Sequence, residues 1–459
     1  MVGAEIRRYA SDRRGQALNV FLGIAGGALG SLAEVLLLPI IVLTFFVGQL
    51  TDSYLVVGLV PAIGVGCWLL ARIPAIVFVT PQRRKLPWAI GASLVRAAST
   101  ALLAAVCFRA EEGAEPQLLR SFFICYIAYS LASGFAGVPI AAVIAKAIPH
   151  DARPFFFRQR AVWSGVMGLV AGLVVVQLLG DGGPSFPRDY ALLFLAATVC
   201  QTATAFFVAT LREPIRIADN PPASLNSIVG SLPLAMADAN FRRFLGFRLL
   251  LALASLADPF LVIYASSELA LSATYVGAYV MAYVGGLLAS GPLWISVQRR
   301  AGDRGVLQLA ALIRLAAPLL AMILPDLSQS DLYRRYVTSD RFLPVALALA
   351  FVAIGVSLGG QSRASASYLT DIAPRRWRGS FGSITNIVLA VAALAPLVGA
   401  VIVERTDFSK LFIAALLIGL LAVFASGALT DTHVRTRPTA AAWRLRRSAL
   451  PAALDRRRS

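Results

Sequence analysis

Long apolar segments separated by short polar ones follow one another along nearly the whole chain. About 20 consecutive apolar residues are enough to cross a bilayer as a helix. The pattern predicts an all-α polytopic membrane protein with twelve spans. They lie at roughly residues 18–46, 53–79, 87–108, 118–147, 157–180, 189–211, 242–267, 272–298, 306–324, 341–369, 379–403 and 408–430.

The polar segments divide the chain further. The longest internal one, 212–240, contains the stretch "SLNSIVGSLPLAMADA", for which we expect a helix lying along the membrane surface. The predicted organisation is an N-terminal arm (1–16), a first six-helix bundle (17–211), a linker (212–240), a second six-helix bundle (241–430) and a basic tail (431–459).

Composition supports the membrane assignment. The chain of 459 residues is 58% hydrophobic and 14% charged, whereas soluble proteins carry about 25% charged residues. The net charge is +18, but the basic residues gather in the polar segments between spans. This distribution is typical of topology signals and contact with anionic lipid, not of nucleic-acid binding.

Charge asymmetry also predicts the orientation. One set of loops, together with both termini, holds most of the 42 Lys and Arg residues. The positive-inside rule therefore predicts that both termini are cytoplasmic, in a multi-pass protein of the plasma membrane, most simply a bacterial inner membrane. The four cysteines and two histidines are scattered, so we expect no disulfide framework, no metal site and no cofactor.

The two predicted bundles repeat each other in sequence. "SLAE" in the first span matches "SLAD" in the seventh, and "SLVRAAS" in the third matches "ALIRLAA" in the ninth. In this alignment of the two halves, Glu34 is equivalent to Asp258, and Arg96 is equivalent to Arg314. The chain therefore consists of two six-span halves of similar design.

These features make the sequence resemble the major facilitator superfamily (MFS). The resemblance rests on the six-plus-six layout, the mid-chain linker, the basic loops after spans 2 and 8, "NFRRFLGFRLL" and "PRRWRG". The loop motif Gly-x-Leu-x-Asp-Arg-x-Gly-Arg-Arg is kept in part at Gly291, Leu293, Arg300, Gly302 and Arg304, without its Asp. The resemblance implies alternating access by two rocking bundles around a central site, with spans 1, 4, 7 and 10 lining the cavity and spans 3, 6, 9 and 12 outermost.

Two carboxylates lie within apolar spans. Glu34 follows small and polar residues at helical spacing, and Asp258 precedes a proline. Ionisable groups at this depth cost about 2.5–3.5 kcal/mol and mark functional sites by default. We expect Glu34 and Asp258 to face a wet crevice and to couple protons or bind substrate. The alternatives are that Glu34 pairs with a nearby arginine, and that Asp258 caps a helix break.

Other polar residues within the spans are candidates for the cavity wall. Each has a structural alternative: the tyrosines can pack between helices, and the arginines can reach the membrane surface. For Arg96 and Arg314, at the cytoplasmic ends of outer spans, we expect this second behaviour. The cavity candidates are Arg72, Tyr126, Tyr129, Tyr279, Tyr283, Gln361 and Arg363.

Charged loop residues are candidates for a cytoplasmic gate. In the superfamily the corresponding loops close the inward side by charge pairs, and Asp371 stands near three arginines here. A solvated surface cluster is the alternative. The gate candidates are Arg83, Arg84, Arg299, Arg300, Asp371, Arg375 and Arg378.

The sequence predicts a secondary active transporter and not an enzyme, because no loop holds a cluster of catalytic groups and no nucleotide-binding glycine loop is present. Proton-coupled export of an amphipathic or cationic small molecule follows from the acids and tyrosines. The alternative is proton-coupled import of a small anionic or polar nutrient through the arginines. The expected partners are a small-molecule substrate, protons and the bilayer, with the protein acting as a monomer.

Overall fold

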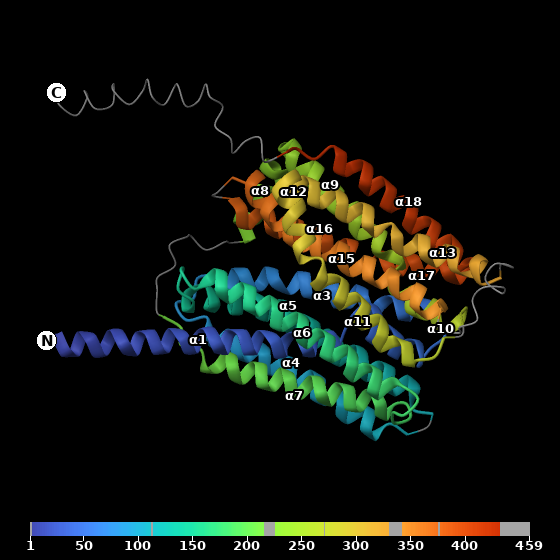
Figure 1. Cartoon of the computed structure of the whole chain (residues 1–459), viewed down its shortest axis with the longest axis horizontal. Helices are drawn as coiled ribbons and strands as arrows, with labels where there is room; N and C mark the ends of the chain where they lie inside the picture. The colour runs from blue at the N-terminus through green and yellow to red at the C-terminus, as the bar shows by residue number, and fades with distance from the viewer. Residues whose placement is uncertain are drawn as a thin grey trace.

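The computed structural model describes residues 2–111, 113–214, 225–269, 271–329, 342–374 and 377–431, and these residues form helices without a strand. Figure 1 shows two groups of roughly parallel helices, one from each half of the chain. We call the end at which α1 begins and α18 ends the proximal end, and the opposite end the distal end.

The first half contains six long helices. The first span is continued beyond α1 by a π-helical turn, η1 (Pro39–Leu43), and by α2 (Thr44–Gly48). The long helices are α1 (Val2–Leu36), α3 (Tyr54–Val79), α4 (Leu86–Arg109), α5 (Glu115–Ala147), α6 (Arg153–Leu179) and α7 (Arg188–Thr210).

The second half begins with α8 (Leu225–Ala237), the helix expected within the linker, which packs against α9 and α16. Its spans are built from more pieces than those of the first half. They are α9 (Ala239–Leu253), η2 (Ala254–Ala257), α10 (Phe260–Ser267), α11 (Thr274–Ala289), α12 (Gly291–Arg314), α13 (Ala316–Gln329), α15 (Phe342–Ile372), α16 (Arg378–Ala392), α17 (Ala395–Arg405) and α18 (Phe408–Gly427).

The described residues contain eleven segments that are long and apolar enough to cross a membrane. One of them, Thr274–Pro325, has 52 residues, which is more than twice the length that one crossing needs. It reverses direction at Gly302, whose φ of 66° lies in the left-handed region that favours glycine. This segment therefore supplies spans 8 and 9, and the prediction of twelve spans is confirmed.

The first span of each half is broken next to its carboxylate. Helix α1 ends two residues after Glu34, before the π-helical turn that starts at Pro39. In the second half, a 3₁₀ turn precedes Asp258 and Pro259. Proline lacks the N–H that an α-helix needs, so the expected break at Asp258 is present, although the Asp258 side chain caps no helix N–H.

The halves touch most extensively along two crossings, α6 with α11 and α3 with α16 and α17, and also where α2 meets α10 and η1 meets α11. At the first crossing, Gly172 and Gly277 face each other so closely that a Cβ on Gly277 would lie 2.5 Å from the backbone nitrogen of Val176. A large residue cannot be accommodated there without separating the helices.

An apolar cluster seals the distal end. Its buried residues come from both halves, including 41–43 and 45–47 of the first and 260–265 of the second. Nearer the proximal end, the clusters stay within one half, apart from Ile73 of α3, which packs against residues of α9 and α16. The halves are therefore closed together at the distal end and separate more at the proximal end.

Glu213 fixes the proximal end of the first half. Its carboxylate accepts hydrogen bonds from the backbone N–H groups of Lys85 and Leu86, at 2.9 Å each, and from Nζ of Lys146 at 2.7 Å. Burial opposes ionisation, but these donors outweigh it and hold the pKa of Glu213 below its usual value. The end of α7 is thus tied to α4 and α5.

Replacing Gly277 by leucine tests the α6–α11 crossing. We expect Gly277→Leu to destabilise this closed distal arrangement by about 1–3 kcal/mol, the usual cost of overpacking. Thermal unfolding of the purified protein measures it. Gly285→Leu on the same helix is the control, because a Cβ there meets nothing within 4 Å. Equal unfolding temperatures for the two variants would contradict the proposed close contact.

Candidate functional site

The two acids and two arginines that the repeat aligns form the same ion pair in each half. Arg96 of α4 donates to Oε1 of Glu34 on α1 at 3.0 Å. Arg314 of α12 donates to Oδ2 of Asp258, between η2 and α10. Each pair joins the first span of its half to the third. Since the four residues at equivalent positions form equivalent ion pairs, the two halves share this interaction as well as their sequence pattern.

Arg96 and Arg314 do not reach the membrane surface, so that prediction was wrong. Their exposed fractions are 5% and 7%. The reason is the carboxylate on the neighbouring span. A guanidinium that finds a counter-charge within its own bundle has no need to extend towards water. Pairing with an arginine, the alternative considered for Glu34, is what the structure shows.

The pairs differ in their contact with solvent. The Glu34 side chain is 61% exposed, whereas that of Asp258 is 12% exposed. The expectation that Asp258 faces a wet crevice is therefore wrong, because protein atoms cover most of its side chain. Only the first half keeps its carboxylate accessible.

Glu34 opens into a cavity of about 750 Å³. The cavity runs from Leu22 and Leu211 near the proximal end to Pro39 at the break in the first span. The residues that line it lie between 22 and 211, so its described wall belongs entirely to the first half. A site shared by both halves was implied by the family resemblance, and this cavity is not one.

Small residues of α1 make room for the cavity. Gly23, Gly27, Gly30 and Ser31, the stripe that precedes Glu34 at helical spacing, all line it. Ser31 also donates to the carbonyl oxygen of Ser164 on α6 at 3.0 Å, while Ser164 donates to the carbonyl oxygen of Gly27 at 3.2 Å. These bonds hold α1 against α6 without filling the space beside them.

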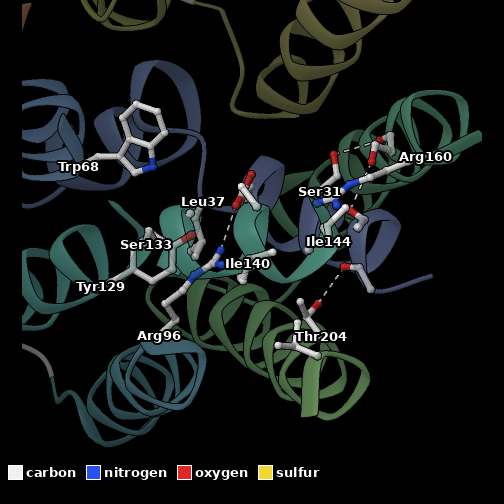
Figure 2. A pocket seen from close by; sticks show the side chains of 18 of the residues that line it. Ser31, Leu37, Trp68, Arg96, Tyr129, Ser133, Ile140, Ile144, Arg160 and Thr204 are labelled. Carbon is white, nitrogen blue, oxygen red and sulfur yellow. Dashed lines mark hydrogen bonds and ion pairs between the residues drawn. The ribbon is translucent and has the colours of Figure 1, made fainter. Parts of the chain in front are cut away.

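Aromatic and hydroxyl groups of α5 form a second wall. The structure places Tyr126 and Tyr129 there, together with Ser130 and Ser133. Figure 2 shows the labelled Tyr129 and Ser133 beside Arg96, with Trp68 above them at the upper left. The Arg96 guanidinium also lies over the Tyr129 ring, 5.7 Å from its centroid.

Arg160 is a cavity residue that the sequence reasoning missed. It lies on α6, and its guanidinium lies flat against α1, where a Cβ on Gly27 would be 2.5 Å from its Nε. The available signal was its place one turn inside the fifth predicted span. Because it stood beside the basic loop, it was counted with the loop charges.

The remaining cavity candidates lie elsewhere, and none is among the described residues that line this cavity. Arg72 stacks over Trp68 at 4.7 Å. Gln361 accepts from Arg248 at 3.2 Å, and the exposed Arg363 donates to Gln298 at 2.7 Å. In α11, Tyr279 stacks on Phe351 with centroids 4.8 Å apart, and Tyr283 is buried.

The gate candidates form no closed latch among the described residues. Their side chains are exposed, and no ion pair joins Asp371 to a described basic residue. This arrangement agrees with a proximal end at which the halves are separate. Those described are Arg83, Arg84, Arg299, Arg300, Asp371 and Arg378, while Arg375 lies outside the described residues.

No family model matches the sequence. The uncharacterized proteins Rv2209 of Mycobacterium tuberculosis and Mb2232 of Mycobacterium bovis are each 27% identical to it over 326 residues. The match covers 70% of this chain and 60% of each relative, so the chain accounts for only part of their length.

Solved structures are similar over nearly the whole chain. A structure of a mutant of the nucleoside transporter NupG has a TM-score of 0.67 at 13% identity and covers 90% of this chain and 100% of its own. A mutant of the peptide transporter POT in complex with alafosfalin has a TM-score of 0.64 at 14% identity, and covers 89% of this chain and 94% of its own. A D-xylose-proton symporter has a TM-score of 0.64 at 14% identity, and covers 90% of this chain and 97% of its own. The chain has the twelve-helix MFS fold, as predicted, and is a multi-pass membrane protein.

The difference in hydration between the two ion pairs predicts different costs of breaking them. We expect Arg314→Met to destabilise the protein by about 3–5 kcal/mol, because it leaves the Asp258 carboxylate buried without a counter-charge. Arg96→Met should cost about 1 kcal/mol or less, since the Glu34 carboxylate that it leaves behind is already exposed to water. Thermal unfolding in one detergent compares them.

The double variant Asp258→Leu with Arg314→Met supplies the control for this comparison, because it removes both charges and restores an apolar contact. We expect it to unfold at a higher temperature than Arg314→Met. If Arg314→Met proves as mild as Arg96→Met, the second pair is not a dry one.

Proposed function

We propose that the protein is a proton-coupled secondary transporter that works by alternating access, with Glu34 as its proton-exchanging group. The observation that carries this proposal is the exposed Glu34 carboxylate at the wall of a cavity within the first half. A carboxylate that is held by a buried arginine and still touches solvent is able to gain and lose a proton without unfolding its surroundings.

The charged and hydroxyl groups beside Glu34 in the cavity come from three helices. They are Arg96 from α4, Arg160 from α6 and the Tyr129 hydroxyl from α5. Because Arg96 donates to the ionised carboxylate, a proton on Glu34 takes the place of that ion pair. Proton binding therefore frees a guanidinium beside the cavity, and this links proton occupancy to whatever the cavity binds.

The arrangement of the halves supports alternation between two states. The apolar cluster closes the distal end, and the cavity begins near the proximal end. With the termini on the cytoplasmic side, as charge asymmetry predicts, this is an inward-facing state of a plasma-membrane carrier. The close α6–α11 crossing is the contact that must loosen for the outward-facing state to form.

Two cargo classes follow from the same cavity. Export of a cationic or amphipathic compound would use Glu34 and the tyrosine rings as its binding groups. Import of an anionic nutrient would use the arginines. The cavity wall contributes two guanidiniums and one carboxylate, and this balance favours the second class.

Proteoliposomes that contain a pH indicator test the coupling. We expect a transported compound to drive proton movement through the wild-type protein. Glu34→Gln should abolish the proton movement while the protein remains folded, because an amide cannot take up the proton. The control is Glu111→Gln, which changes an exposed acid beyond the end of α4. Proton movement of undiminished size in Glu34→Gln would overturn the assignment.

A further inference from the structure

The described wall of the cavity in the first half has more basic than acidic side chains. Two guanidiniums, Arg96 and Arg160, line it with a single carboxylate, Glu34. Each guanidinium carries five N–H donors and no acceptor. Glu34 already accepts from Arg96, so the donors that remain have no anionic acceptor on the described wall.

Hydroxyl groups of the same wall can add hydrogen bonds to a bound anion. Those of Tyr126, Tyr129, Ser130 and Ser133 all come from α5 and line the cavity with Arg96. A hydroxyl donates one hydrogen bond, so these groups complement the guanidiniums without a further basic residue.

Arg160 is held where a ligand can reach it. Among the described residues it makes no ion pair, and Glu34 is the one acid among the residues that line the same cavity. Its guanidinium lies against the bare backbone of α1 at Gly27, so its position is fixed by packing and its charge is left unpaired. Figure 2 shows Arg96 and Arg160 reaching the cavity from different helices.

We propose that this cavity binds a small organic anion, with its acidic group between Arg96 and Arg160. Planar guanidinium groups match carboxylate, phosphate and similar oxyanions in geometry as well as in charge. With Glu34 ionised the three side chains carry a net charge of about +1, and with Glu34 protonated about +2, so the site is complementary to an anion in both states.

The rest of the wall specifies an apolar body on that anion. Trp68, Leu37 and Ile140 line the cavity beside the tyrosines. A volume of about 750 Å³ falls within the range of pockets that enclose drug-sized ligands. An inorganic anion would leave this surface uncovered, whereas an aromatic or branched organic acid would cover it.

The inference deepens the proposed function and rests on it in one respect, namely that the bound anion is the cargo. Arg96 is shared between Glu34 and the ligand. When Glu34 takes up a proton, the Glu34–Arg96 ion pair breaks, and Arg96 becomes available to the anion. A proton and an organic anion therefore occupy the cavity together, which corresponds to symport.

Pairs of acids and amines with related skeletons test the substrate class. The probes are phenylacetate and phenethylamine, indole-3-acetate and tryptamine, and octanoate and octylamine. Each is added at the same concentration to the purified full chain, and the shift in unfolding temperature is measured. We expect at least one acid to raise the unfolding temperature of the wild-type protein, and its paired amine to raise it less or not at all.

Matched variants connect the shift to the cavity. Arg160→Gln should abolish the shift, and Arg158→Gln should retain it, because Arg158 lies on the same helix, is exposed and is not among the lining residues. Gly27→Ala provides a second variant. Its Cβ would displace the Arg160 guanidinium without changing the charge of the protein. The apparent affinity for the acid, taken from the dependence of the temperature shift on acid concentration, should then fall at least about tenfold, equal to about 1.4 kcal/mol.

Three results would overturn the inference: the amines stabilise the protein more than the acids, no acid stabilises it, or the acid shift is equally large in Arg160→Gln. These measurements use no pH gradient. An acid that binds but drives no proton movement would contradict the proposed coupling alone. Proton movement driven by an amine would leave the coupling intact and contradict the anion site.

Discussion

A carboxylate at the depth of a bilayer needs a counter-charge or water, because hydrocarbon solvates neither the ion nor its hydrogen bonds. This chain supplies the counter-charge twice by the same construction. In each half, an acid near the break of the first span is paired with an arginine on the third span. Helices α1 and α4 both pack against α7, and η2 and α12 both pack against α18, which places the partners within reach of each other.

The halves then use this ion pair differently. Around Asp258 and Arg314 the protein is dense, and the pair joins two spans as a buried contact. Around Glu34, the glycines of α1 and the hydroxyls of α5 leave a cavity, so the same chemistry meets solvent. Without its arginine, Asp258 is a buried carboxylate that nothing compensates, whereas Glu34 is a carboxylate that water solvates. Duplication thus supplied two equivalent positions, and packing made one structural and the other accessible.

Much of the fold follows from the sequence. Apolar length predicted the spans, and among the described residues the reversal at Gly302 is the one place where length alone merges two crossings. The repeat aligned Glu34 with Asp258 and Arg96 with Arg314, and so contained both ion pairs. They were not paired beforehand because periodicity along one helix shows which residues share a face but not which face meets a neighbouring span.

The site was harder to predict for the same reason. The small-residue stripe before Glu34 and the tyrosine stripe of α5 both lie on the cavity wall. The corresponding stripe of α11 is packed, with Tyr279 against Phe351. Nothing in the spacing distinguishes these stripes, because both have aromatic and small residues one turn apart. Whether a stripe meets water depends on the side chains of the facing helix. Gly27 of α1, for example, has no side chain and leaves room for the Arg160 guanidinium of α6.

Infrared difference spectroscopy during a pH titration tests the central claim most directly, because it detects the protonated carboxyl group itself. One carboxyl band should appear as the pH falls, shift rapidly on exchange into heavy water, vanish in Glu34→Gln and persist in Asp258→Asn. A band that survives Glu34→Gln, or that depends on Asp258 instead, would contradict the division between a wet and a dry ion pair.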